Sequence, residues 1–267
     1  MAGRLAAALA ITLAAALMPP KPVAAANPQL AESWRRCTDS EADISLSGCS
    51  TIIQANGESG AHRAIAFYNR GIAYRHRNQY DLAVQDFSQA IRLRPGDAEA
   101  FNNRGITYDD QGQFARAIQD FVHAIRLKPG YAEAYYNRGN AYRHKSLYER
   151  RAGGADTKSA TDIAIRDYDQ AIRLKPDYAA AFVNRGVAHY DRTQYARSIQ
   201  DYDEAIRLKP DLAEAFNNRA LAYYKTSQYP RALPDFDQTI RLKKDYGNAL
   251  INRALGPYEA PVRRPSQ

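Results

Sequence analysis

An Asn-Arg pair recurs six times along the chain, and both side chains can make specific polar contacts. The asparagines are Asn69, Asn103, Asn137, Asn184, Asn218 and Asn252. A carboxamide both donates and accepts hydrogen bonds, so a row of carboxamides can pair with the backbone of an extended peptide. The guanidinium that follows each of them needs a charged or polar partner wherever it is partly buried. The pattern therefore predicts a binding surface, an internal network, or both.

The spacing of these pairs indicates a repeat architecture. Successive asparagines are 34, 34, 47, 34 and 34 residues apart. A fixed period in this range is typical of stacked structural repeats. Within each repeat, apolar residues recur at the spacing of two amphipathic helices, and a proline follows the second helix. The closing prolines are Pro95, Pro129, Pro176 and Pro210.

Small and aromatic residues keep step with the asparagines. The small residues are Gly71, Gly105, Gly139 and Gly186 in the first helix, and Ala83, Ala117, Ala164 and Ala232 in the second. The aromatic residues are Phe67, Phe101, Tyr135, Phe182 and Phe216 in the first helix, and Phe87, Phe121, Tyr168, Tyr202 and Phe236 in the second. We expect the two columns of small residues to lie where the paired helices approach most closely.

In order and offset, these columns resemble the tetratricopeptide repeat family over residues 64–246, which would hold five repeats. The resemblance implies an all-α fold, a right-handed superhelical solenoid of stacked antiparallel helix pairs. Stacking is needed because one pair cannot bury its own apolar face. The 47-residue spacing contains a 13-residue insertion, which we expect to form a loop at about residues 149–161.

The two ends of the sequence differ from the repeats. Residues 1–26 combine one early arginine, a short apolar run and three small residues, which predicts a secretory signal peptide cleaved after Ala26. An uncleaved membrane anchor is the alternative. Because no later segment is apolar enough to span a bilayer, we expect a periplasmic or secreted bacterial protein. Residues 247–256 are expected to form a capping helix, and residues 257–267 a disordered tail.

Cys37 and Cys49 are the two cysteines of the chain. Counting back 34 residues from Gly71 and Ala83 leads to these two positions, so residues 27–63 are interpreted as a degenerate helical pair. An even number of cysteines in an exported protein favours a disulfide. We therefore predict a Cys37–Cys49 bridge, with two free thiols as the alternative.

The arginine column has a matching acidic column in the second helices. The arginines are Arg70, Arg104, Arg138, Arg185 and Arg219, and the aspartates are Asp86, Asp120, Asp167, Asp201 and Asp235. We predict a structural ladder of ion pairs between the two columns. Two registers remain open, since each arginine could pair with the aspartate of its own repeat or with that of the repeat before.

The resemblance also implies that the first helices line a concave groove. The candidate groove residues are Asn69, Asn102, Asn103, Tyr136, Asn137, Asn184, Asn217 and Asn218. This row is similar to the asparagine ladder in the superhelix of the O-linked N-acetylglucosamine transferase. The alternative is that the asparagines bond neighbouring helices and have a structural role only.

The sequence contains no recognisable catalytic, metal-binding or phosphate-binding motif, so we expect no enzyme activity and no cofactor. The net charge of +8 is spread over interspersed basic and acidic residues. The predicted function is a scaffold that binds a protein or an extended peptide in its groove. The alternatives are a chaperone-like assembly factor for envelope or secreted proteins and, less favoured, the binding of an anionic polymer; nucleic acid is disfavoured by export.

Overall fold

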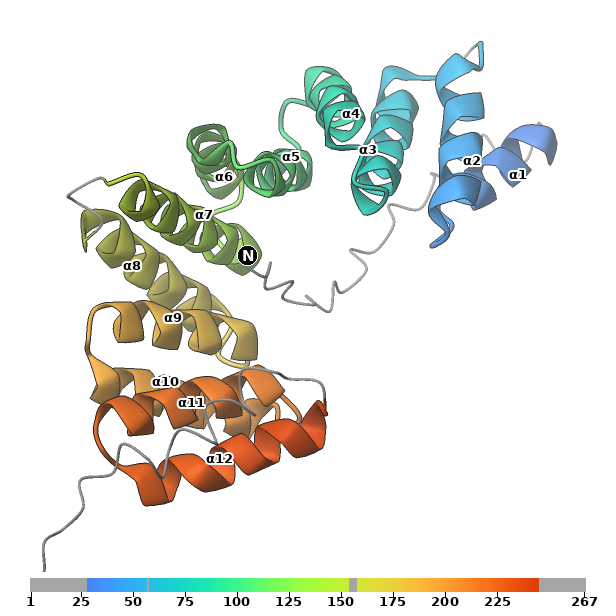
Figure 1. The fold of residues 1–267 in the computed structure, drawn as a ribbon. Helices are drawn as coiled ribbons and strands as arrows, with labels where there is room; N and C mark the ends of the chain where they lie inside the picture. Colours follow the sequence, from blue (N-terminus) through green and yellow to red (C-terminus); the bar gives the residue numbers. More distant parts are fainter. Residues whose placement is uncertain (1–27, 57, 154–157, 245–267) are drawn as a thin grey trace, which may run out of the picture. The chain divides into compact units, whose positions relative to one another are not determined.

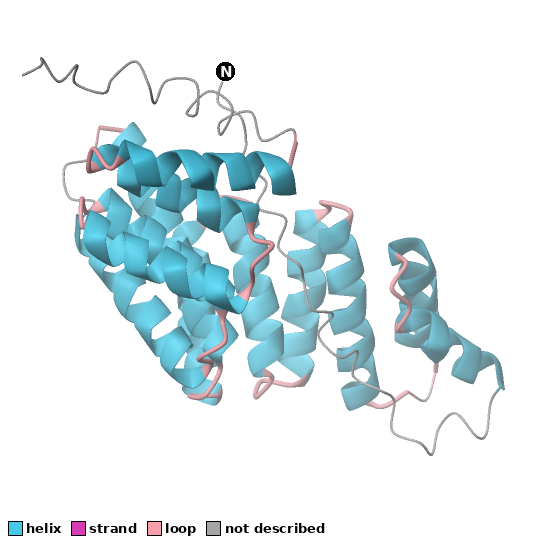
Figure 2. Ribbon diagram, turned by 90° about the horizontal axis from the view of Figure 1, so that it is seen from below, coloured by secondary structure: helices cyan, strands magenta, loops and turns pink. Residues whose placement is uncertain are grey.

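The computed structural model describes residues 28–56, 58–153 and 158–244. In these ranges the chain forms twelve α-helices joined by short turns, and no strand (Figures 1 and 2). The all-α class that the resemblance implies is confirmed. The predicted signal peptide, capping helix and tail lie outside the described residues, as does Asn252.

The chain divides into two compact units, residues 1–111 and 112–267. The described helices of the first unit are α1 (Pro28–Cys37), α2 (Ala42–Gln54), α3 (Gly60–His76), α4 (Tyr80–Leu93) and α5 (Ala98–Asp110). Helix α1 packs against α2, and α3 against α4, as antiparallel hairpins. The second helix of each hairpin then packs on the next first helix, α2 on α3 and α4 on α5.

The second unit repeats this scheme. Its described helices are α6 (Phe114–Leu127), α7 (Ala132–Arg151), α8 (Lys158–Leu174), α9 (Ala179–Asp191), α10 (Tyr195–Leu208), α11 (Ala213–Lys225) and α12 (Tyr229–Leu242). The hairpins are α7–α8, α9–α10 and α11–α12, and successive hairpins meet through α8 on α9 and α10 on α11. Each unit is therefore a stack of helix hairpins, the arrangement of an α-solenoid.

A left-handed residue ends the first helix of each regular hairpin. These residues are Asn78, Gly112, Thr193 and Ser227, with φ between 57° and 73°. After three of them, the N–H of the following glutamine donates to a carbonyl five residues earlier at 2.9 Å, which closes the last helical turn. Thr193 is notable in this set, because a β-branched residue is strained at positive φ.

Glycines of the first helices face aromatic rings of the second helices. A Cβ added at Gly71, Gly139 or Gly186 would come within 2.7–2.9 Å of the ring of Phe87, Tyr168 or Tyr202, respectively. The space left by each glycine is therefore filled by an aromatic ring of the second helix. The rings are fully buried, and each needs a first helix without a side chain at that point.

The insertion lengthens two helices and adds little loop. Helix α7 has 20 residues against 13 in α5, α9 and α11, and α8 has 17 against 14 in α10. The loop predicted at 149–161 is thus wrong in its extent, since residues 149–151 belong to α7 and 158–161 to α8. The segment before Gly153 holds neither glycine nor proline from residue 140 onward, so nothing in it stops the helix.

The two cysteines form a disulfide between α1 and α2, with their Cα atoms 4.5 Å apart. The disulfide was predicted, but the alignment of the two cysteines with Gly71 and Ala83 was wrong for one of them. Helix α2 begins 38 residues before α4, so Cys49 occupies the place of Phe87 and not that of Ala83. The disulfide therefore replaces the contact that Gly71 makes with Phe87 in the next hairpin.

The glycine-ring contact predicts a position-specific cost. We expect Gly186→Val to lower the free energy of unfolding by about 2 kcal/mol, because the added methyl groups must displace the Tyr202 ring. Urea unfolding followed by circular dichroism measures the change. The matched control is Gly130→Val in the same unit, where an added Cβ meets nothing within 4 Å. Equal stability of the two variants would contradict the proposed role of the contact.

Candidate functional site

The arginine column forms ion pairs with the aspartate of its own hairpin. Arg70 pairs with Asp86, Arg138 with Asp167, Arg185 with Asp201 and Arg219 with Asp235. In each pair both Nε and Nη2 donate to the carboxylate, at 2.6–3.1 Å. A guanidinium has the planar fork that suits such a two-point contact. The register within one hairpin is therefore the one that these four arginines adopt.

The third nitrogen of the guanidinium reaches the hairpin before. Nη1 donates to Asp169 from Arg185 and to Asp203 from Arg219, each at 2.7 Å. Nη1 of Arg70 donates to Ser50 at 3.0 Å in the same way. One guanidinium thus joins its own first helix to the second helices of two successive hairpins. The sequence-based prediction missed these acceptors, although Asp169 and Asp203 lie two residues after a ladder aspartate, in one readable column.

Two members of the predicted ladder lie in different compact units. Arg104 belongs to the first unit, where its Nη1 donates to Ser88 of α4 at 3.0 Å. Asp120 belongs to the second unit and is 4% exposed. At the position where Arg138 would find a second acceptor, α6 carries Val122, which offers none.

Each ladder arginine also lies over an aromatic ring three residues earlier. The guanidinium carbon is 5.3–5.7 Å from the ring centroid of Phe67, Phe101, Tyr135, Phe182 or Phe216. This places a cation over the face of the ring, a favourable arrangement. The aromatic column of the first helices therefore holds the arginines in place, which explains why both columns keep the same period.

The ladder is largely withdrawn from solvent. The paired arginine side chains are 18–21% exposed and their aspartates 5–8%. Burial raises the pKa of Asp86, Asp167 and Asp201 above its ordinary value, although the paired arginine lowers it. Desolvation thus offsets much of the attraction, so the pairs fix geometry more than they add net stability.

The asparagine row is more enclosed than an open groove requires. Four of the predicted groove residues are buried, with 4–6% of their surface exposed: Asn69, Asn102, Tyr136 and Asn217. The prediction that they line an accessible groove does not hold for these four, because neighbouring helices cover them. Asn103, Asn137, Asn184 and Asn218 remain partly exposed.

Two of the exposed asparagines are held by tyrosines of an earlier first helix. Nδ2 of Asn103 donates to the Tyr68 hydroxyl at 2.9 Å, and Nδ2 of Asn184 to the Tyr136 hydroxyl at 2.9 Å. Asn218 accepts a bond from the buried Asn217 at 3.3 Å. The asparagines therefore do bond neighbouring helices, as the structural alternative expects, and their orientation is fixed by these bonds.

A polar network replaces apolar packing in the α7–α8 hairpin. Asn140 accepts hydrogen bonds from the Tyr168 hydroxyl and from Asn184, both at 2.8 Å. The equivalent residues of other repeats are Ile72, Ile106, Val187 and Leu221. The hydroxyl of the fully buried Tyr168 needs a partner, which a phenylalanine at this place would not. Asn140 supplies that partner, whereas Tyr202, in the same column as Tyr168, has Val187 at the equivalent place.

The described residues offer no site for metal chemistry and no membrane span. They contain no group of three or more His, Cys, Asp or Glu residues that could hold a metal ion. None of their helices is both long and apolar enough to cross a bilayer. The polar features that bear on binding are the arginine ladder, the asparagine row and a basic pocket at the insertion, which is treated below.

Helix hairpins of about 34 residues that stack through second-to-first helix contacts define the class of α-solenoid repeat proteins. Models of the tetratricopeptide repeat match residues 64–97, 87–119 and 212–245, and a TPR repeat model matches residues 107–144, 160–192 and 188–227. The chain belongs to the tetratricopeptide repeat family.

Solved structures share this fold. A crystal structure of MamA is 25% identical, with a TM-score of 0.54, and the match covers 67% of this chain and 96% of MamA. YrrB is 18% identical, with a TM-score of 0.57. The match covers 79% of this chain and 100% of YrrB. TTC0263 of Thermus thermophilus is 19% identical, with a TM-score of 0.58 and coverage of 73% and 99%. No curated protein matches this chain.

The ladder geometry predicts a clear difference between buried and exposed arginines. We expect Arg185→Ala to lower the free energy of unfolding by about 3 kcal/mol, because it leaves the Asp201 carboxylate buried without its counter-charge. Arg207→Ala is the control, since Arg207 pairs with Glu204 at the surface and its loss should change stability by less than about 1 kcal/mol. Denaturation by urea compares them, and similar losses would argue against a structural ladder.

Proposed function

We propose that this protein is a non-enzymatic periplasmic or secreted scaffold, which binds a protein or an extended peptide in the groove lined by its first helices. The tetratricopeptide repeat family consists of interaction scaffolds, and YrrB is described as having an unusual peptide-binding site. The observation that carries the proposal is the fixed orientation of one first-helix asparagine in each unit, Asn103 of α5 in the first unit and Asn184 of α9 in the second.

The bonds to the tyrosines engage Nδ2 of these asparagines and leave the carboxamide oxygen Oδ1 available to accept a hydrogen bond. Among the described residues, nothing donates a hydrogen bond to Oδ1 of Asn103 or Asn184, while Nδ2 of both is already engaged. A carboxamide oxygen in this state is an acceptor in need of a donor. The backbone N–H groups of an extended polypeptide are such donors, and they are the same for every sequence. The row is therefore suited to reading a peptide backbone with little side-chain preference.

Export is a separate part of the proposal. A disulfide in the N-terminal hairpin is typical of an oxidising compartment, and residues 1–26 have the composition of a signal peptide. The protein recovered from the periplasm or medium is expected to begin at Asn27. Its two cysteines should resist alkylation until a reductant is added. Intact-mass spectrometry reads both features, and a retained N-terminus or two reactive thiols would contradict export in this form.

The groove is tested by capture from an envelope extract. The exported protein should retain a partner that the triple variant Asn103→Ala, Asn137→Ala, Asn184→Ala loses, because the variant lacks the acceptor row. A matched triple variant, Gln85→Ala, Gln119→Ala, Gln200→Ala, removes exposed carboxamides from the second helices and should retain the partner. Thermal melting of both variants, followed by circular dichroism, establishes that they are folded.

The outcome also separates the possible roles of the scaffold. One partner lost only from the Asn variant supports a dedicated peptide scaffold, whereas many unrelated partners would favour a chaperone-like assembly factor. Capture that persists in the Asn variant would contradict groove binding. Capture that vanishes steeply with added salt in all proteins would instead indicate an anionic polymer.

A further inference from the structure

The insertion builds a pocket of about 380 Å³ at the end of the α7–α8 hairpin. Four basic residues and one acidic residue line it: Arg143 and Arg150 from α7, Lys158 at the start of α8, and Asp191 with Arg192 at the end of α9. Arg150 and Lys158 belong to the helical extensions that the other described hairpins lack. The pocket is therefore a product of the insertion and does not form part of the asparagine row.

In the first unit, the residues equivalent to Arg143 and Asp191 form an ion pair. Arg75 donates to Asp110 at 2.9 Å, and these two residues are 35 positions apart. Arg143 and Asp191 occupy the same two columns, 48 positions apart because of the 13-residue insertion. They form no salt bridge in the described structure; the pocket lies between their helices instead. Beside the insertion, the ion pair that Arg75 and Asp110 form is therefore not made.

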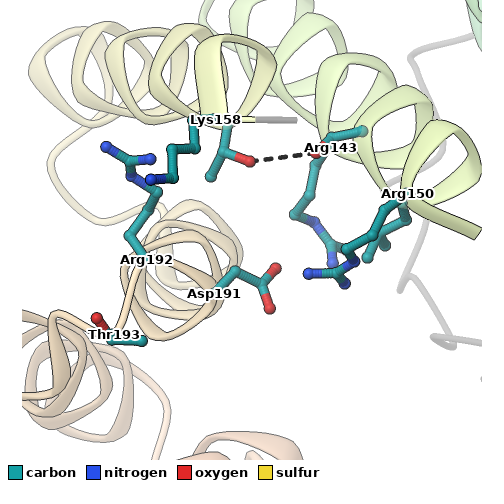
Figure 3. Close-up of a pocket in the computed structure, with 9 residues that line it drawn as sticks. Arg143, Arg150, Lys158, Asp191, Arg192 and Thr193 are labelled. Atoms are coloured by element: carbon teal, nitrogen blue, oxygen red, sulfur yellow. Dashed lines mark hydrogen bonds between the residues drawn. The ribbon is translucent and has the colours of Figure 1, made fainter. Parts of the chain in front are cut away.

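The open pair leaves positive charge uncompensated. Figure 3 shows the guanidinium groups of Arg143 and Arg150 turned toward the single carboxylate of Asp191. Arg192 has its own partner in Asp162 at 3.2 Å, whereas Arg150 and Lys158 form no salt bridge with any described residue. The lining thus carries more cations than carboxylates that could neutralise them, and such an excess favours an anion from outside.

One donor in the pocket is both buried and unused. Nε of Arg143 has no hydrogen-bond partner among the described residues, although it is inaccessible to solvent. Its guanidinium lies near the hydroxyl of the buried Tyr168. An unpaired buried donor is costly, and a bound acceptor would remove that cost.

We propose that this pocket is a binding site for an oxyanion, a carboxylate or phosphate group, that Arg143 and Arg150 hold with the help of Lys158. Arginine is well suited to this chemistry, because its planar fork pairs with two oxygens of a carboxylate or phosphate. Asp191 competes with the ligand for the same two guanidinium groups and sets the affinity. The site is independent of the groove, so the two can be tested apart.

Isothermal titration calorimetry of the exported protein with inorganic phosphate, and separately with succinate, tests the proposal at low ionic strength. Arg150→Gln should weaken binding by about tenfold, the loss of one charge-assisted pair. Asp191→Asn should strengthen it, because the competing carboxylate is gone. Arg173→Gln is the matched control: it removes one exposed positive charge from α8 outside the pocket, and it should leave binding unchanged.

The two probes distinguish the source of the anion. Binding of phosphate alone assigns the site to phosphate groups, and binding of succinate alone assigns it to carboxylates such as those of acidic side chains. Either result, with the opposite effects of Arg150→Gln and Asp191→Asn, supports the site. Absence of heat from both anions, or equal affinity of Arg150→Gln and Arg173→Gln, would overturn it. Because Arg150 is exposed, its replacement is not expected to unfold the protein.

Discussion

The stacking of the hairpins depends on the hydrogen bonds that the guanidinium of each ladder arginine makes. In the regular hairpins, two nitrogens bind the aspartate of the same hairpin, and a third reaches the hairpin before. Apolar contact alone would tolerate sliding or rotation of one hairpin on the next, because it has no direction. A planar guanidinium that is bonded at three points resists such sliding and rotation. The ladder therefore sets the angle between successive hairpins, and the ring that stacks beneath each arginine holds it there.

Departures from the repeat gather at one place in the second unit. Asn140 replaces an apolar residue, α7 and α8 exceed the usual length, and Arg143 and Asp191 form no salt bridge. Each change breaks a rule that the other hairpins obey. Natural sequences tend to break local rules where function requires it. The region between α7 and α9 is therefore the part of the described chain most specific to this protein, whereas the remaining hairpins serve mainly to extend the stack.

Much of the fold could be predicted from the sequence, because residues of the same type recur at equivalent positions of each repeat. The period of the asparagines, the helical spacing of the apolar residues and the closing prolines were sufficient for the hairpins and their order. The aspartate partners of the arginines were also readable, since one column of the second helices holds an aspartate in all five repeats. Whether each arginine pairs with the aspartate of its own repeat or of the repeat before could not be predicted, because the choice depends on how far one hairpin is rotated against the next.

The remaining errors have physical causes that a single sequence does not display. Exposure of the asparagines depends on the side chains of neighbouring helices, so Asn102 and Asn217 could not be separated from Asn103 and Asn184 beforehand. The insertion was interpreted as a loop because it contains two glycines, yet the residues before Gly153 continue the helix. The place of Cys49 was misjudged because the first hairpin is shorter than the regular repeat by about one helical turn between its cysteines.

The most direct test of this account is a double-mutant cycle between Arg219 and Asp203 of the hairpin before, measured by urea unfolding of the single and double alanine variants. The pair is joined by a hydrogen bond of 2.7 Å from Nη1 of Arg219 to the Asp203 carboxylate. A ladder that orders the stack predicts a coupling free energy of at least about 1 kcal/mol, so the double variant should lose less stability than the sum of the two single variants. A coupling free energy near zero would contradict the account, because the hairpins would then be held by apolar packing alone.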